Sequence, residues 1–106
     1  MRDGIYFLEF QDNFNDFGNG VFVVQNNIIN GGNYAFSFQG EIINQKSKVI
    51  IKQHDNSIEK AINETLNVSI KKTNYDYELL GSITNRPNLV VYIKAKFIGD
   101  LFLKLT

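Results

Sequence analysis

Residues 20–32 read GVFVVQNNIINGG, and this stretch decides the fold. The apolar run from Val21 to Gln25 leads into the dipeptide Asn26-Asn27, and Ile28-Ile29 follows directly. Asparagine tolerates the positive φ angles that a tight hairpin turn requires. The stretch therefore predicts two antiparallel strands joined by a two-residue turn.

Alternation of apolar and polar residues with a period of two continues on both sides of this hairpin, as is typical of half-buried strands. The expected strands carry their apolar positions at Tyr6, Leu8 and Phe10, at Tyr34, Phe36 and Phe38, at Val49 and Ile51, at Leu66, Val68 and Ile70, at Tyr77, Leu79 and Ile83, at Leu89, Val91, Ile93, Ala95 and Phe97, and at Leu101, Leu103 and Leu105.

Polar segments rich in Asn and Gly separate these strands. We expect a break or bulge from Asn30 to Asn33, and turns from Asn44 to Ser47 and from Asn85 to Asn88. The one long interruption covers about residues 55–65, and its apolar spacing allows a single helical turn there.

About eight strands with short connections, and no segment that could be a crossover helix, favour a meander over a parallel sheet. Eight consecutive strands can close into a barrel, which removes exposed edges. We therefore expect an all-β single domain over residues 1–106, an eight-stranded antiparallel up-and-down, lipocalin-like β-barrel. A Greek-key sandwich is the competing architecture. The interior of such a small barrel should be a packed core or a narrow pocket.

The charge is balanced overall but divided along the chain. Residues 1–45 hold one cation against five anions, a net of −4, whereas residues 46–106 hold ten cations against six anions, a net of +4. Without a long-range basic field we expect no direct binding to nucleic acid and no association with a membrane. Local charged contacts remain compatible with this balance.

The sequence has no cysteine, and no stretch resembles a signal peptide or a transmembrane helix. We therefore expect a soluble, cytoplasmic protein.

Residues that could support catalysis or metal binding are sparse. His54, the single histidine, falls on the outward side of its strand beside Asp55, and Asp12 and Asp16 lack the glycine and the closing glutamate of a calcium loop. The glycines lie between strands, where they serve turns and bulges. We expect no enzymatic activity, no cofactor and no metal.

Several strands are apolar on both faces, so one face needs cover from the 55–65 loop, from a second subunit or from a partner. A homodimer is one interpretation. Its surface would comprise Ile5, Phe7, Phe22, Val24, Val90 and Tyr92.

Short segments in order along the chain resemble the GrlR family of small bacterial regulatory proteins. They are Asp3-Gly4-Ile5-Tyr6, the Gly20 strand ending in Asn26-Asn27-Ile28-Ile29, Gly31-Gly32-Asn33, Phe38-Gln39-Gly40 and Lys96-Phe97-Ile98. The resemblance implies a lipocalin-like barrel, commonly a homodimer. It also implies a regulator of transcription that acts by binding a transcriptional activator.

The resemblance further implies a partner contact at the turn after the aromatic strand. The best-known family member carries a run of acidic residues there, but this chain reads Asn44-Gln45-Lys46-Ser47-Lys48. An alternative function is a binder or sensor of a small hydrophobic ligand, with Tyr34, Phe36, Phe38 and Tyr77 lining the pocket.

Overall fold

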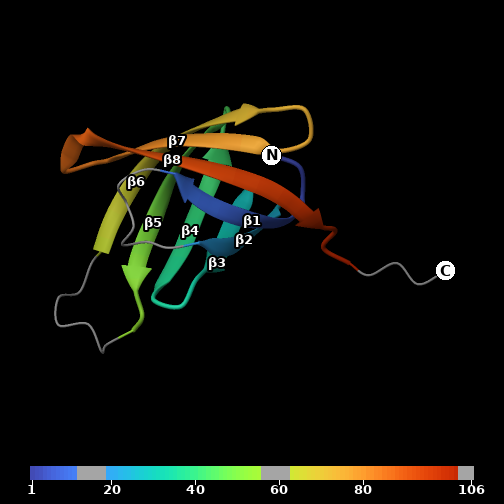
Figure 1. The fold of residues 1–106 in the computed structure, drawn as a ribbon, viewed down its shortest axis with the longest axis horizontal. Helices are drawn as coiled ribbons and strands as arrows, with labels where there is room; N and C mark the ends of the chain where they lie inside the picture. The colour runs from blue at the N-terminus through green and yellow to red at the C-terminus, as the bar shows by residue number, and fades with distance from the viewer. Residues whose placement is uncertain (12–18, 56–62, 103–106) are drawn as a thin grey trace.

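The computed structural model describes residues 1–11, 19–55 and 63–102, and these residues form strands and turns without a helix. Figure 1 shows the strands crossing one another at a steep tilt, with β7 and β8 along one side. Their bounds are β1 (Gly4–Gln11), β2 (Gly20–Gln25), β3 (Ile28–Gly32), β4 (Phe36–Ile43), β5 (Lys46–Gln53), β6 (Asn63–Lys72), β7 (Tyr77–Ile83) and β8 (Arg86–Gly99).

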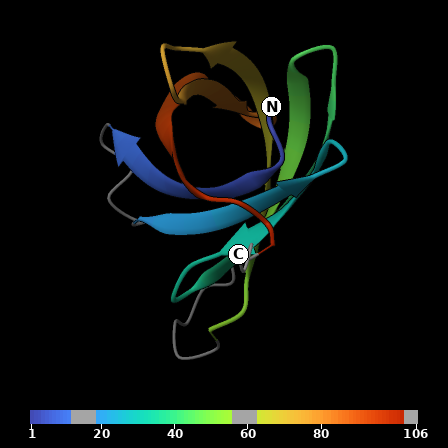
Figure 2. The same cartoon turned by 90° about the vertical axis from the view of Figure 1, so that its right-hand side faces the viewer.

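Every strand pairs antiparallel with the next one in the chain, and β8 also pairs with β1. The closing register runs from Ile5 opposite Gly99 to Gln11 opposite Tyr92. Viewed from the side, the strands surround one interior (Figure 2). The fold is therefore a closed eight-stranded up-and-down barrel, as the sequence predicted, and the Greek-key sandwich is wrong.

Two hairpins use two-residue turns with positive φ at both central positions. Asn26 and Asn27 have φ angles of 52° and 63°, and this confirms the turn on which the fold prediction began. Asn44 and Gln45 repeat these two values. The predicted turn from Asn44 to Ser47 therefore ends at Gln45, and β5 begins at Lys46.

Other predicted boundaries were shifted. The β7–β8 turn lies at residues 84 and 85, and Arg86 already belongs to β8. Residues 30–32 stay in β3 and do not break it. β6 starts at Asn63, so the long connection ends earlier than expected, and the expected helical turn lies outside the described residues. Leu101 falls in a bend after β8; Leu103 and Leu105 lie outside the described part.

The side chain of Asn33 explains why β4 begins at Phe36 and not at Tyr34. Asn33 Oδ1 accepts hydrogen bonds from the backbone N–H groups of Ala35, at 3.0 Å, and Phe36, at 2.9 Å. This local bonding engages the N–H groups of Ala35 and Phe36 within the bend. Tyr34 consequently sits in the bend, with 68% of its surface exposed.

Gly31 permits an unusually close approach of β2 and β3. A Cβ atom there would overlap the carbonyl oxygen of Val21 and Cα of Phe22, its register partner. Both are backbone atoms, so no side-chain rotation could relieve the overlap.

The barrel interior is filled by its own side chains. The buried hydrophobic residues come from all eight strands and the β3–β4 bend, and the interior space among Leu8, Phe38, Leu66 and Ile93 is only about 20 Å³. That is room for about one water molecule. The described interior is therefore a packed core, the first of the two options that the sequence left open.

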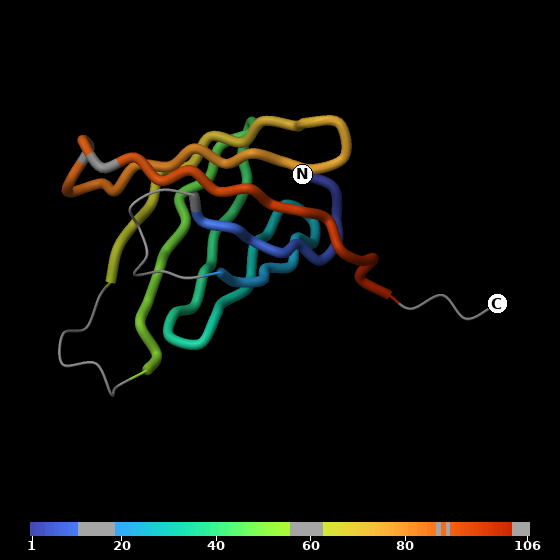
Figure 3. The backbone as a smooth tube through the Cα atoms, in the orientation of Figure 1, coloured from blue at the N-terminus to red at the C-terminus, as the bar shows by residue number. Residues whose placement is uncertain are grey.

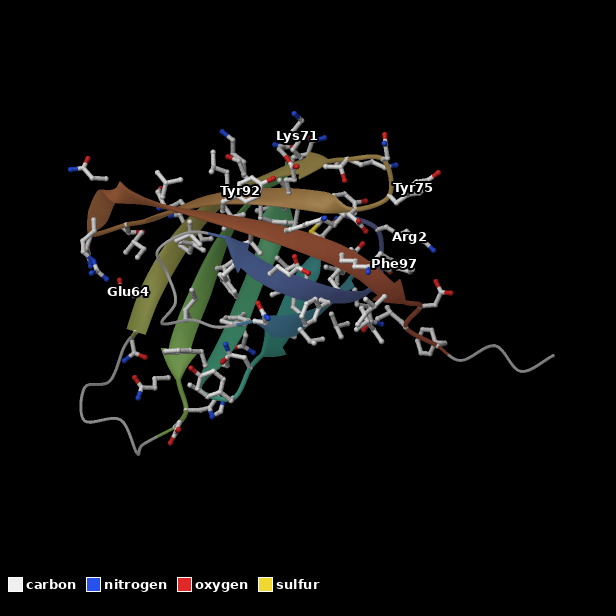
Figure 4. The ribbon with its side chains drawn as sticks, in the orientation of Figure 1. Arg2, Glu64, Lys71, Tyr75, Tyr92 and Phe97 are labelled. Carbon is white, nitrogen blue, oxygen red and sulfur yellow. The ribbon has the colours of Figure 1, made fainter. Side chains whose placement is uncertain are left out.

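One end of the core is an aromatic cluster around Tyr6. The rings of Phe22, Tyr77 and Phe97 stand edge-on to Tyr6, with centroids 5.6–5.8 Å away. The Tyr6 hydroxyl donates a hydrogen bond of 2.6 Å to the carbonyl oxygen of Arg2. Figure 4 shows Arg2 beside Phe97, over whose ring its guanidinium carbon lies 4.0 Å from the centroid. The N-terminus is thereby held against this end of the barrel.

Candidate functional site

A concave surface lies on the outer face of β4 to β8, with a volume of about 690 Å³. We call it the outer groove. It is lined by Glu41, Ile43, Lys46, Ser47, Lys48, Asn67, Val68, Ser69, Leu80, Gly81, Ser82 and Val90.

Two neighbouring rows of outward positions build the outer groove, because antiparallel register places one residue of each strand beside one of the next. The first row is Glu41, Lys48, Asn67, Ser82 and Val90. The second is Ile43, Lys46, Ser69, Leu80 and Tyr92, of which Tyr92 does not line the groove.

The β7–β8 hairpin forms one wall of the groove. Its register shifts between Ser82 and Ile83, next to the lining residues Ser82 and Val90. Such irregularities bend a strand and increase its twist. In Figure 3 the end of this hairpin extends beyond the barrel, away from both chain termini.

Three apolar side chains in the groove are open to solvent. Ile43 is 62% exposed, Leu80 52% and Val90 47%. Next to Leu80, a hydrogen bond to Glu78 raises the pKa of Tyr92.

Of the five residues predicted at the partner contact, Lys46, Ser47 and Lys48 line the groove, while Asn44 and Gln45 form the adjoining turn. Four of the five are exposed. Ser47 is buried on the inner face, with its Oγ atom lacking a hydrogen-bond partner, so its hydroxyl is not part of an exposed contact.

The residues predicted for a dimer surface do not form one patch. Placing Phe22 and Val24 on the outer face was wrong, since they are 3% and 0% exposed in the core. The register explains the error, because Phe22 lies opposite the inward Tyr6. Ile5 and Phe7 face outward on β1, half-buried, and pair with the outward valines of β2.

Val90 and Tyr92 lie on β8 at and beside the outer groove, and Tyr92 pairs with Gln11, at the opposite end of β1 from Ile5. The pairs on β1 and β8 therefore belong to different surfaces.

The residues predicted for a ligand pocket are also dispersed. Phe36 and Phe38 are buried in the core, and Tyr77 packs against it. The Tyr77 hydroxyl accepts a hydrogen bond of 3.0 Å from the backbone N–H of Arg2. Tyr34 is exposed in the bend, so the four do not line a common cavity.

His54 lies at the end of β5 and is exposed, as its position in the alternation predicted. Its Nε2 atom is 2.9 Å from the carbonyl oxygen of Asn33. Asp12 and Asp16 lie outside the described residues. In residues 1–11, 19–55 and 63–102, no three His, Asp or Glu side chains are grouped so as to hold a metal ion.

Sequence reasoning missed eight lining residues: Glu41, Ile43, Asn67, Val68, Ser69, Leu80, Gly81 and Ser82. The available signal was an apolar residue at an outward position of a strand, as at Ile43 and Leu80.

Comparison with known proteins adds no assignment. No protein-family model matches the sequence, and no curated protein matches it. Along the described part of the chain, no helix is long and apolar enough to cross a membrane.

Proposed function

We propose that this protein is a non-enzymatic regulator that acts by binding another protein through the outer groove. The observation that carries the proposal is the contrast between the two spaces of the barrel. The interior offers about 20 Å³, whereas the outer groove offers about 690 Å³ and exposes Ile43, Leu80 and Val90. Small-molecule sites usually enclose about 300–1,000 Å³, so the filled interior gives the small-ligand alternative no support.

The kind of partner follows from the resemblance to the GrlR family. We propose a transcriptional activator, held through the groove that includes Lys46 and Lys48. The barrel itself would make no contact with DNA, and regulation would come from occupying the activator.

A homodimer is a separate part of the proposal. Ile5 and Phe7 of β1 lie beside Val21 and Val23 of β2 on the outer face, opposite to the core. These four residues replace the earlier set that included Phe22 and Val24. A monomeric mass in sedimentation equilibrium at tens of micromolar would refute the proposed dimer. The proposal that the outer groove binds a partner would be unaffected.

Capture from the source cell tests the proposed function with three tagged proteins: the natural chain, Leu80→Asp and Ile50→Asp. Ile50 is the matched control, because it is 45% exposed on the outer face of β5 but does not line the groove. We expect the natural chain and the Ile50 variant to retain one protein stoichiometrically, and Leu80→Asp to lose it at least tenfold.

The captured protein is then identified, and its DNA-dependent transcription is measured with and without the purified barrel. The proposed function fails if Leu80→Asp captures the same proteins, or if transcription does not respond to the barrel. Release of a stoichiometric lipid or aromatic acid on denaturation would favour the ligand-binding alternative.

A further inference from the structure

Two lysines in the outer groove have no charged partner among the described residues. Lys46 and Lys48 are exposed on β5, and the ion pairs found in the described part are Arg2–Asp100 and Arg86–Glu64. Glu41 faces Lys48 across the β4–β5 register, but the two charged groups do not come within ion-pair distance. The groove lining thus holds two cations and one anion, with the cations side by side on one strand.

Apolar side chains flank these lysines along the second row. Ile43 is one strand from Lys46 on one side, and Leu80 is two strands away on the other. With strands about 4.8 Å apart, Ile43 and Leu80 are separated by roughly 14 Å, which an extended peptide covers in about four residues. A bound segment that contacts both would therefore pass over the lysines between its two apolar anchors.

We propose that the occupant of the outer groove is a short segment of the partner protein in which Asp or Glu residues lie between apolar residues. This inference rests on the proposed function and names the chemistry of the partner. Covering Lys46 and Lys48 with a neutral segment would remove water from two unpaired charges, which is costly, whereas carboxylates compensate that loss. The apolar residues would cover Ile43, Leu80 and Val90.

The shape of the site favours a segment over a lipid surface. A groove of about 690 Å³ on a closed barrel is concave, and a bilayer surface is not.

The test uses a display library of random 12-residue peptides selected on the intact, immobilised protein. Enriched peptides are synthesised, and their dissociation constants are measured by fluorescence anisotropy. We expect the enriched set to combine apolar residues with an excess of Asp and Glu. We also expect binding to weaken as the salt concentration rises.

Charge variants decide whether the lysines make the contact. Lys46→Glu combined with Lys48→Glu should weaken binding at least tenfold, and Glu41→Gln should strengthen it about twofold to fivefold. Lys52→Glu is the matched control, because Lys52 is exposed on β5 but does not line the groove, and it should leave binding unchanged. All of these positions are exposed, and urea midpoints establish that each variant is folded.

The inference is overturned if no peptide is enriched, if the enriched peptides are basic or uncharged, or if the double reversal leaves the affinity unchanged. It is also overturned if sedimentation equilibrium shows a dimer that Leu80→Asp converts to a monomer, because a second copy would then fill the groove. Preferential binding to anionic vesicles over the peptides would assign the lysines to a lipid surface.

These failures differ from a failure of the proposed function. If capture depends on Leu80 but the partner contacts the groove through a basic or neutral segment, only the present inference falls. If acidic peptides bind but the captured proteins do not depend on Leu80, the regulatory function falls.

Discussion

Removal of one hydroxyl group, in Tyr6→Phe, tests how the N-terminus is fastened to the barrel. The Tyr6 side chain is completely buried, and its hydroxyl donates a hydrogen bond of 2.6 Å to the carbonyl oxygen of Arg2. The substitution keeps the ring and its edge-on contacts but removes this bond. A net contribution of about 1 kcal/mol is expected for such a hydrogen bond. In a domain of this size it corresponds to a decrease of about 4–8 °C in Tm.

The pH dependence gives a second, independent signature. Burial, followed by the neighbouring Tyr77, raises the pKa of Tyr6 above its ordinary value near 10. A group whose folded-state pKa is raised contributes stability below its unfolded pKa, and this contribution is lost as the pH rises beyond about 10. The natural chain should therefore be more stable than Tyr6→Phe by a constant free energy of unfolding between pH 6 and 9. This difference should disappear above about pH 10.

Urea unfolding at a series of pH values measures both effects, with Tyr75→Phe as control. Tyr75 is 88% exposed, so its hydroxyl is already solvated and its removal should change nothing. With a urea slope of about 2 kcal/mol per molar, the expected shift in midpoint for Tyr6→Phe is about 0.5 M. Equal midpoints for Tyr6→Phe and the natural chain, together with parallel pH profiles, would show that the hydroxyl does not anchor Arg2.

Two further predictions concern the backbone. Gly31→Ala should destabilise the fold by at least about 3 kcal/mol or prevent folding, because its Cβ would overlap backbone atoms of β2. Gly99→Ala is the control. Its Cβ would meet only a side-chain carbon of Ile5 at 3.9 Å, so the thermal midpoint should change little. Gln45→Gly should stabilise the protein by about 0.5–1 kcal/mol, because Gln45 has a φ of 63° and glycine adopts this angle without strain. Asn27→Gly should have a smaller effect, because asparagine tolerates positive φ. Equal effects of the two variants on the free energy of unfolding in urea would argue against backbone strain at Gln45.

The period of alternation carried most of the fold information, because it depends on residue type alone. It found all the strands and the Asn26-Asn27 turn. The alternation did not predict the ends of strands correctly where a side chain competes with strand pairing for backbone hydrogen bonds. At Asn33 the side-chain oxygen bonds two backbone N–H groups, and Tyr34 leaves the sheet although its spacing fits the strand.

The choice of face in β2 shows a different kind of error. Val21, Phe22, Val23 and Val24 are all apolar, so the alternation cannot say which pair points inward. Pairing with β1 decides it, because Tyr6 is inward and lies opposite Phe22. A register shift by one residue would exchange the two faces, and information about it lies in the partner strand.

The outer groove depends on curvature, which local sequence does not encode. Alternation correctly predicted that Lys48 points outward, but Lys46 was expected in the turn, and nothing in the pattern placed Leu80 or Val90 near them. That proximity follows from the pairing of β5 with β6, β6 with β7, and β7 with β8, and from the register shift that bends the β7–β8 hairpin. The three-dimensional arrangement of the charges shows more than the balanced net charge does. Because Lys46 and Lys48 lie in the outer groove, whose described lining holds a single anion, Glu41, this protein of zero formal charge has a local cationic site. The double variant Glu41→Lys with Lys48→Glu keeps both the net charge of the protein and the number of cations in the outer groove. It therefore tests whether partner binding depends on the position of the charges or on their number.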